Sequence, residues 1–157
     1  MAIQNNLPTP VIDAIQEHHG TGLVSFFHHK ASLQLEMDFY EKGRNANTQV
    51  REGDFRYPGP KPQTRETAIV SLADAVEAAS RSLEKITPGN IESLVNDIIE
   101  DRRNDGQLDC CELTQADIHK LKQTFTSTLL TMLHGRVSYP KNENIGKSAG
   151  NVPAGSG

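Results

Sequence analysis

The sequence has few cysteines, no long basic run and no long apolar run. Its only cysteines, Cys110 and Cys111, are adjacent, so they form neither a disulfide framework nor the spacing of a zinc site. This pattern favours a reducing, cytoplasmic setting. No run of about 18 apolar residues occurs, and the first residues lack a signal-peptide core, so we expect no membrane span in this chain. The net charge of -4 does not indicate DNA or RNA as a partner.

The length of 157 residues is suited to one domain with a modest core. Apolar residues recur at helical spacing, and no strand-length alternating runs occur. We therefore predict an all-α protein of about five helices around one core. The first predicted helix starts at Thr9-Pro10 and ends by Gly20, and the second runs from Leu23 to about Met37. The third runs from about Arg65 to Glu84. The fourth starts at Thr87-Pro88 and ends by Gly106, and the fifth runs from Leu113-Thr114 to Gly135.

The apolar spacing also predicts which side chains face the core. In the fourth helix they are Ile91, Leu94, Val95, Ile98 and Ile99. In the last helix they are Ile118, Leu121, Phe125, Leu129 and either Met132 or Leu133. In the second helix they are Leu23, Phe26, Phe27, Ala31 and Leu35.

Three segments are predicted to lack regular secondary structure. Residues 38–54 are polar and glycine-containing, which is typical of a loop or insertion. The stretch Phe55–Pro62 contains three prolines, which exclude regular helix and predict a stiff, extended loop. From Lys141 to Gly157 the chain has almost no apolar residue, and we expect disorder there.

The first candidate for chemistry is the pair His18-His19, which precedes Gly20. Imidazoles are common ligands of transition metals. Adjacent side chains within a helix point about 100° apart, but a glycine at a helix end can let the second histidine leave the helical path. The alternative is one surface and one half-buried histidine. In the pair His28-His29 we expect one side chain to pack and the other to face solvent.

Asp74 is the second candidate, because it lies within the largely apolar stretch Ala68–Ala79. If it is buried, its carboxylate needs a hydrogen bond, an ion pair or a metal. Alternatively it faces solvent or pairs with a neighbour along the helix. Glu77 has a partner at the favourable i+4 spacing in Arg81, which leaves Asp74 without an obvious one.

Arg56 and Lys61 flank the proline-rich turn. Cations on a stiff loop suit a phosphate, although solvated loop charges are an equally good interpretation. His119 and His134 are isolated, and we interpret both as structural. Cys110-Cys111 receives no role.

Four motifs together resemble one family. They are Glu17–Thr21, the proline loop Phe55–Gln63, the helix Ala68–Ala79 and the turn Asn104–Asp109. Over roughly residues 3–140 the chain resembles the cytosolic HD domain of the seven-transmembrane HD proteins, the PgpH type. The resemblance implies a helical HD-domain-like bundle that is N-terminally incomplete. It also implies a partial HD phosphohydrolase domain over residues 1–140, followed by the tail 141–157.

The resemblance further implies a metal-dependent phosphodiesterase that hydrolyses cyclic di-AMP. By resemblance, His18, His19 and Asp74 are ligands of a divalent transition metal, iron or manganese, and Arg56 and Lys61 are substrate contacts; no catalytic residue is assigned. The family's early histidine, its His-Asp pair and a further histidine would precede Met1. We therefore expect the chain to be inactive alone, because two-metal hydrolysis needs the complete ligand set.

Other functions remain open. The chain could be a non-catalytic nucleotide- or protein-binding helical module, or a plain helical interaction domain. The resemblance implies a cyclic dinucleotide as ligand, a place at the cytosolic face of the membrane, and a homo-oligomer or an upstream HD segment as protein partner. An apolar face left uncovered by such a segment would promote association.

Overall fold

The computed structural model describes residues 6–42 and 49–134. Its elements are α1 (Thr9–Glu17), α2 (Ser25–Lys42), the 3-10 helix η2 (Glu52–Phe55), α3 (Arg65–Ser80), α4 (Pro88–Asn104) and α5 (Gln115–His134). In these ranges the β structure is limited to one isolated bridge between Leu23 and Arg56. The all-α prediction is therefore confirmed. The predicted end at Gly135 and the predicted disordered tail 141–157 lie outside the described residues.

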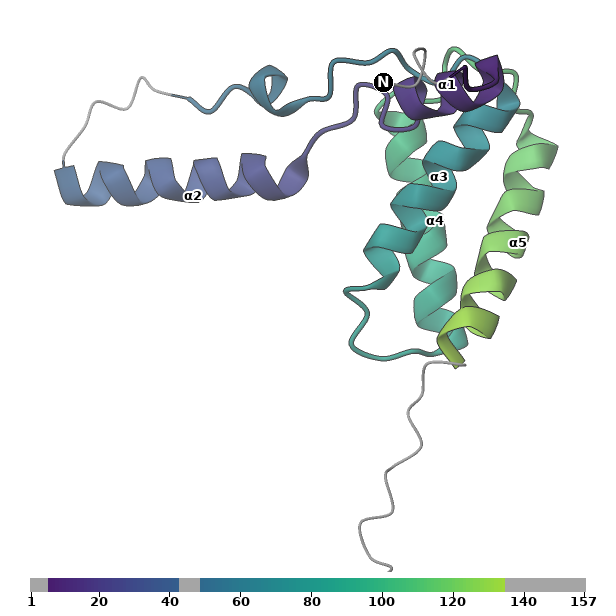
Figure 1. Ribbon diagram of the computed structural model, residues 1–157. Coiled ribbons are helices and arrows are strands. Elements are labelled where there is room, and N and C mark those ends of the chain that lie inside the picture. The colour runs from purple at the N-terminus through teal and green to yellow at the C-terminus, as the bar shows by residue number, and fades with distance from the viewer. Residues whose placement is uncertain (1–5, 43–48, 135–157) are drawn as a thin grey trace, which may run out of the picture.

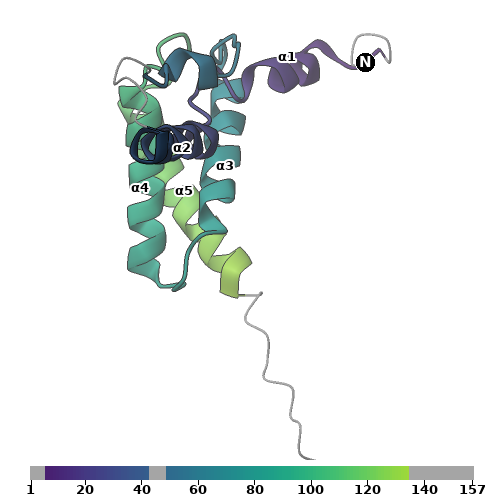
Figure 2. The ribbon, with the colours of Figure 1, turned by 90° about the vertical axis from the view of Figure 1, so that its left-hand side faces the viewer.

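Helices α3, α4 and α5 lie side by side and enclose the core (Figures 1 and 2). The buried apolar side chains at its centre are Leu72, Val76, Ile91, Val95, Ile99, Ile118, Leu129 and Leu133. The periodicity of α4 is confirmed, with Leu94 and Ile98 packed at the margin. In α5 the inward residue is Leu133, because Met132 is 44% exposed.

Side-chain caps fix the starts of three helices. The hydroxyl of Thr87 accepts a hydrogen bond from the amide of Asn90, as the Thr-Pro start predicts. Thr64 and Thr67 form a reciprocal capping box at α3, and Thr114 caps α5 through Asp117. At α1 the prediction is wrong by one residue. The helix already includes Thr9, because the Pro8 carbonyl accepts from the amides of residues 11 and 12.

Helix α2 differs most from expectation. It continues to Lys42, so it takes up the first part of the predicted loop. It packs against η2 and stands away from the three-helix core (Figure 1). For this reason Phe26 and Phe27, which we expected to face inward, are 71% and 57% exposed. None of the helices in the described part of the chain is long and apolar enough to cross a membrane.

Helix α3 is shorter than predicted and is buried on one side. It ends at Ser80 rather than near Glu84. Its small and apolar side chains at 67, 68, 71, 72 and 76 face the core, while Ile69 and Val70 are 36% and 44% exposed. Asp74 lies on the outer side, and its side chain is 52% exposed. Of the two alternatives for Asp74, the buried one is therefore wrong, and the side chain faces solvent.

The packing of α4 yields a first prediction. Ile99→Ala removes a fully buried side chain and should lower the free energy of unfolding by about 2–5 kcal/mol, since it adds a cavity to the loss of buried area. Chemical denaturation followed by circular dichroism measures this. Val70→Ala, at a side chain 44% exposed, is the control and should change stability much less. Equal losses in the two variants would contradict the assignment of the core.

Candidate functional site

The two adjacent histidines lie where α1 ends. Glu17 is the last helical residue, His18 keeps helical backbone angles as the C-cap, and Gly20 has a φ of 57°. This left-handed conformation, which glycine adopts without strain, turns the chain. The ring centroids of His18 and His19 lie 4.0 Å apart with an interplanar angle of 42°. The two imidazoles therefore stay together instead of pointing to different sides of a helix.

The hydrogen bond of His18 defines its tautomer. Its Nδ1 lies 2.7 Å from the carbonyl oxygen of Ala14. Because a carbonyl oxygen can only accept, Nδ1 carries the hydrogen and Nε2 of the neutral ring keeps its lone pair. A backbone bond of this kind orients the histidine ligands of many metal sites. His18 therefore has the tautomer that a metal ligand needs.

His19 faces Asp74 across the gap between α1 and α3. Its Nδ1 lies 3.8 Å from Oδ2 of Asp74, and its ring stacks on Tyr57 with centroids 4.3 Å apart. Burial lowers the pKa of His19 below its ordinary value of 6.5, and Asp74 acts in the opposite direction. At pH 7 His19 is therefore mostly neutral, which is the form that binds metals.

A buried glutamine holds the segment that follows the histidines. Gln107 is 1% exposed. Its Oε1 accepts a hydrogen bond from the amide of Thr21 at 2.9 Å, and its Nε2 donates to the Thr21 hydroxyl at 3.0 Å and to Asp105 at 2.8 Å. A Cβ at Gly20 would collide with the same amide group. The turn before α5 therefore positions the histidine turn, and it requires glycine at position 20.

Arg56 also binds Thr21 and Asp105, the two residues that Gln107 holds together. Its guanidinium donates to both oxygens of Asp105, at 3.0 and 2.7 Å, to Glu52, and to the carbonyl oxygen of Thr21 at 2.9 Å. The bidentate pair raises the pKa of Arg56 and lowers that of Asp105. For Arg56 to contact a phosphate, as the sequence suggested, one of these acceptors must be exchanged. That contact remains a prediction.

The proline loop lies against the histidine turn. The Tyr57 amide donates to the Gly22 carbonyl at 3.0 Å, and the buried carboxylate of Glu17 accepts from the Gln63 amide at 2.9 Å. Lys61 is carried on this loop beside the turn. Its Nζ lies 3.8 Å from Asp109 Oδ2, and its side chain is 31% exposed. Of the two predicted cations, Lys61 therefore has fewer and more distant carboxylate partners than Arg56.

The remaining chemistry-bearing side chains lie elsewhere. His28 packs against Phe55 and His29 is exposed, as predicted. The predicted pair of Glu77 and Arg81 forms, at 2.7 Å. The side chain of His134 lies outside the described residues. The sequence analysis did not predict the positioning role of Gln107. The sequence feature that could have indicated this role is the location of Gln107 in the Asn104–Asp109 motif.

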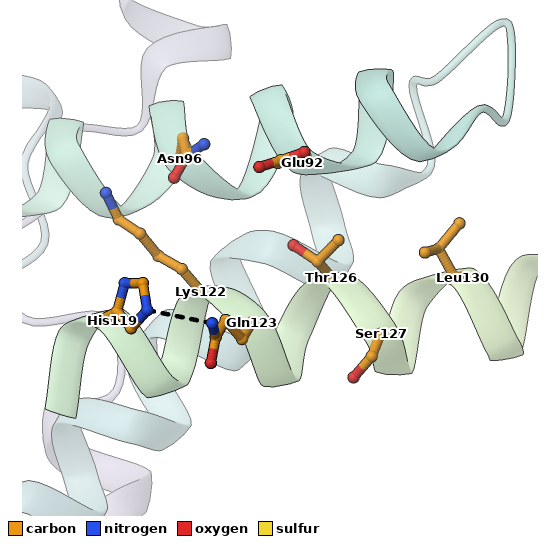
Figure 3. A pocket seen from close by; sticks show the side chains of 8 residues that line it. All are labelled: Glu92, Asn96, His119, Lys122, Gln123, Thr126, Ser127 and Leu130. Carbon is orange, nitrogen blue, oxygen red and sulfur yellow. Dashed lines mark hydrogen bonds between the residues drawn. The ribbon is translucent and has the colours of Figure 1, made fainter. Parts of the chain in front are cut away.

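A separate groove lies between α4 and α5, with a volume of about 390 Å³ (Figure 3). His119 is hydrogen-bonded to Gln123 at its edge, and Lys122 forms an ion pair with Glu100. None of the residues predicted as ligands or substrate contacts lines it. The groove is therefore distinct from the histidine turn.

The histidine turn does not by itself form a metal site. Among the described residues, no three His, Cys, Asp or Glu side chains are grouped so that they could hold a metal ion. His19 and Asp74 face each other, and His18 lies beside them. The structure thus brings the three predicted ligands close together, and their role in binding a metal stays a prediction.

Comparison with known proteins identifies the relatives. No protein-family model matches the chain. The cyclic-di-AMP phosphodiesterase PgpH of Bacillus subtilis is 43% identical over 134 residues, covering 85% of this chain and 17% of that protein. PgpH of Listeria monocytogenes is 38% identical over 141 residues, covering 90% of this chain and 18% of that protein. The crystal structure of the L. monocytogenes PgpH HD domain in complex with cyclic-di-AMP aligns with a TM-score of 0.72 and 38% identity.

The chain is homologous to the C-terminal portion of the PgpH HD domain. The alignment covers 83% of this chain and 56% of the crystallised domain. The predicted resemblance and the HD-domain-like helical fold are confirmed. The chain spans roughly a sixth of the length of the full-length PgpH relatives.

Removal of the Gln107 amide should loosen the histidine turn. Gln107→Leu leaves the Thr21 amide without its partner and removes one of the two hydrogen bonds to Oδ2 of Asp105, which keeps the bond from Arg56. The change should cost about 1–3 kcal/mol of unfolding free energy. Denaturation measures the loss, and histidine NMR spectra should show changed shifts at His18 and His19. Gln123→Leu, at an exposed amide on α5, is the matched control. Unchanged histidine shifts in Gln107→Leu would contradict the positioning role.

The pair of Arg56 and Asp105 should make stability sensitive to acid. The bond from Arg56 is the main reason why the pKa of Asp105 lies below 3.8 in the folded chain. Its contribution is present above the unfolded pKa and is lost as the pH falls through the lower folded value. Stability should therefore fall below about pH 4, as urea denaturation across pH will show.

Asp105→Asn should be less stable at pH 7 and should lose less of its remaining stability on acidification. Asp109→Asn, at a side chain 69% exposed, is the control and should keep the wild-type profile. If Asp105→Asn loses as much unfolding free energy at low pH as the wild type does, other carboxylates cause the acid sensitivity.

Proposed function

We propose that this chain is the C-terminal part of a metal-dependent HD-type phosphodiesterase that hydrolyses cyclic di-AMP. In this proposal His18, His19 and Asp74 are metal ligands, for iron or manganese by family resemblance. The observation that supports it is the meeting of these three side chains, with His18 and His19 rings 4.0 Å apart and Asp74 3.8 Å from His19. The homology to a domain crystallised with cyclic-di-AMP supports the substrate.

The electrostatics of the turn agree with a ligand role. His18 presents Nε2, and the pKa of His19 is lowered so that its ring is neutral at pH 7. The side chain of Asp74 is 52% exposed, although His19 lies 3.8 Å from it. Such a carboxylate is accessible to groups supplied from outside the described bundle. We propose that an upstream HD segment, at the cytosolic face of the membrane, supplies the remaining ligands.

Lys61 is our first choice for a substrate contact, and Arg56 is the second. Lys61 lies on the stiff loop beside the histidine turn and has only a 3.8 Å ion pair with Asp109 to exchange. A lysine ammonium recognises a phosphate as a point charge. Arg56 would first have to release Glu52 or Asp105.

Complementation tests this function. The chain alone should not hydrolyse cyclic di-AMP, because its described residues group no three potential ligands around a metal. Mixing or co-expression with the preceding part of a PgpH HD domain should produce hydrolysis in the presence of manganese. Asp74→Ala should abolish this activity, and His29→Ala, which alters an exposed histidine, should preserve it. Hydrolysis by the purified chain alone that is lost in Asp74→Ala would refute the prediction of inactivity.

The half-exposed Lys61 beside the turn favours one alternative, a module that binds the nucleotide without hydrolysing it. Calorimetry with cyclic di-AMP distinguishes the two. Binding that survives chelation and His19→Ala, without hydrolysis on complementation, would favour the binding module over the enzyme.

A further inference from the structure

Helix α2 carries an exposed apolar stripe along its outer side. Its members are Phe26, Leu33, Met37 and Tyr40, which are 71%, 45%, 52% and 85% exposed. Phe27 and Phe39 are also exposed, at 57% and 49%, and flank the stripe. The other side of the helix is occupied, since His28 contacts Phe55 beside η2. An exposed apolar stripe on a helix that stands away from the core marks an interaction surface. It also needs explanation, because most helical stability in proteins comes from packing of an apolar face against another element.

The spacing of the stripe is that of a helix–helix seam. Positions 26, 30, 33, 37 and 40 are separated alternately by four and three residues, which is the a/d repeat of a coiled coil. Lys30 is the one polar residue in the repeat. A single polar residue at such a position specifies register and orientation. From Phe26 to Tyr40 the seam is about 21 Å long at about 1.5 Å per residue.

The charges beside the seam indicate the partner and its direction. His29 and Lys30 lie in the first turns of α2, whereas Glu36 and Glu41 lie toward its end, and all four are exposed. This order opposes the helix dipole, which favours acidic residues at the start and basic residues at the end. An antiparallel copy of the same helix would place the acidic end of one beside the basic end of the other. A parallel copy would place like charges together.

We propose that α2 is a homodimerisation arm that pairs antiparallel with α2 of a second copy of this chain. The stripe supplies the apolar contact, and Lys30 and Glu36 of the two copies attract each other. The acidic residues that flank the stripe argue against an anionic membrane surface as occupant. A seam this short places the dimer in the weak, concentration-dependent class. The proposal stands apart from the proposed function, since it needs no metal, nucleotide or upstream segment.

Sedimentation velocity of the full chain, from micromolar to millimolar concentration, tests the surface. The wild type should shift from monomer to dimer as concentration rises. Leu33→Glu, at the centre of the stripe, should remain monomeric, whereas Val70→Glu should dimerise as the wild type does. Val70 is the matched control, because it is 44% exposed against 45% for Leu33 and lies on α3. A monomeric wild type, or a dimer lost in Val70→Glu and kept in Leu33→Glu, would overturn the proposal.

A charge swap tests the direction. Lys30→Glu and Glu36→Lys should each raise the dimer dissociation constant about tenfold, because each places like charges together. The double variant should restore it to near the wild-type value. Lys30→Glu moves an acidic residue toward the helix start, which favours the isolated helix, so loss of the dimer in this variant cannot come from loss of the helix. A double variant no better than the single ones would exclude the antiparallel arrangement.

Discussion

The hydrogen bonds that hold Thr21 are the constraint on which the candidate site depends. The Gln107 amide binds its backbone amide and hydroxyl, while Arg56 binds its carbonyl oxygen. Asp105 accepts from both Gln107 and Arg56. Buried polar groups that are fully satisfied specify one arrangement, and removal of any partner leaves another unpaired. Through Thr21, this network fixes where the chain turns after His18 and His19.

The same network explains why three distant segments of the chain meet. Between the histidine turn, the proline loop and the turn before α5, Pro62 is fully buried, and most of the recorded contacts are hydrogen bonds. They meet because each supplies a hydrogen-bonding group that the others lack. The buried carboxylate of Glu17 accepts a hydrogen bond from the amide of Gln63. This bond likewise holds the end of α1 against the proline loop. The three-helix core provides the rigid base, and the polar network sets the site upon it.

Two groups of exposed apolar side chains in the described part of the chain bear on the proposals. One group lies on α1 and α3, where Val11, Ile15 and Val70 are exposed and Asp74 is one turn along α3 from Val70. A segment that covered this surface would lie next to the candidate ligands, which agrees with an upstream HD segment. The other is the stripe of α2, which stands away from the core and is the surface that we propose pairs with a second copy. Completion of the site and dimerisation would therefore use separate surfaces.

The sequence by itself determined the helices of the core and the identity of the candidate ligands. The periodicity of α4, the cap at Thr87 and the glycine after His18-His19 are local features, so local patterns suffice to predict them. Tertiary structure decided the exposure of Asp74, the outward direction of α2 and the positioning role of Gln107. Composition suggested a buried Asp74 because the surrounding residues are small and apolar. Burial of the residues around Asp74 depends on which elements cover α3. Contact of a side chain with Thr21 depends on how turns from distant parts of the sequence pack together. A local sequence pattern determines neither of these two outcomes.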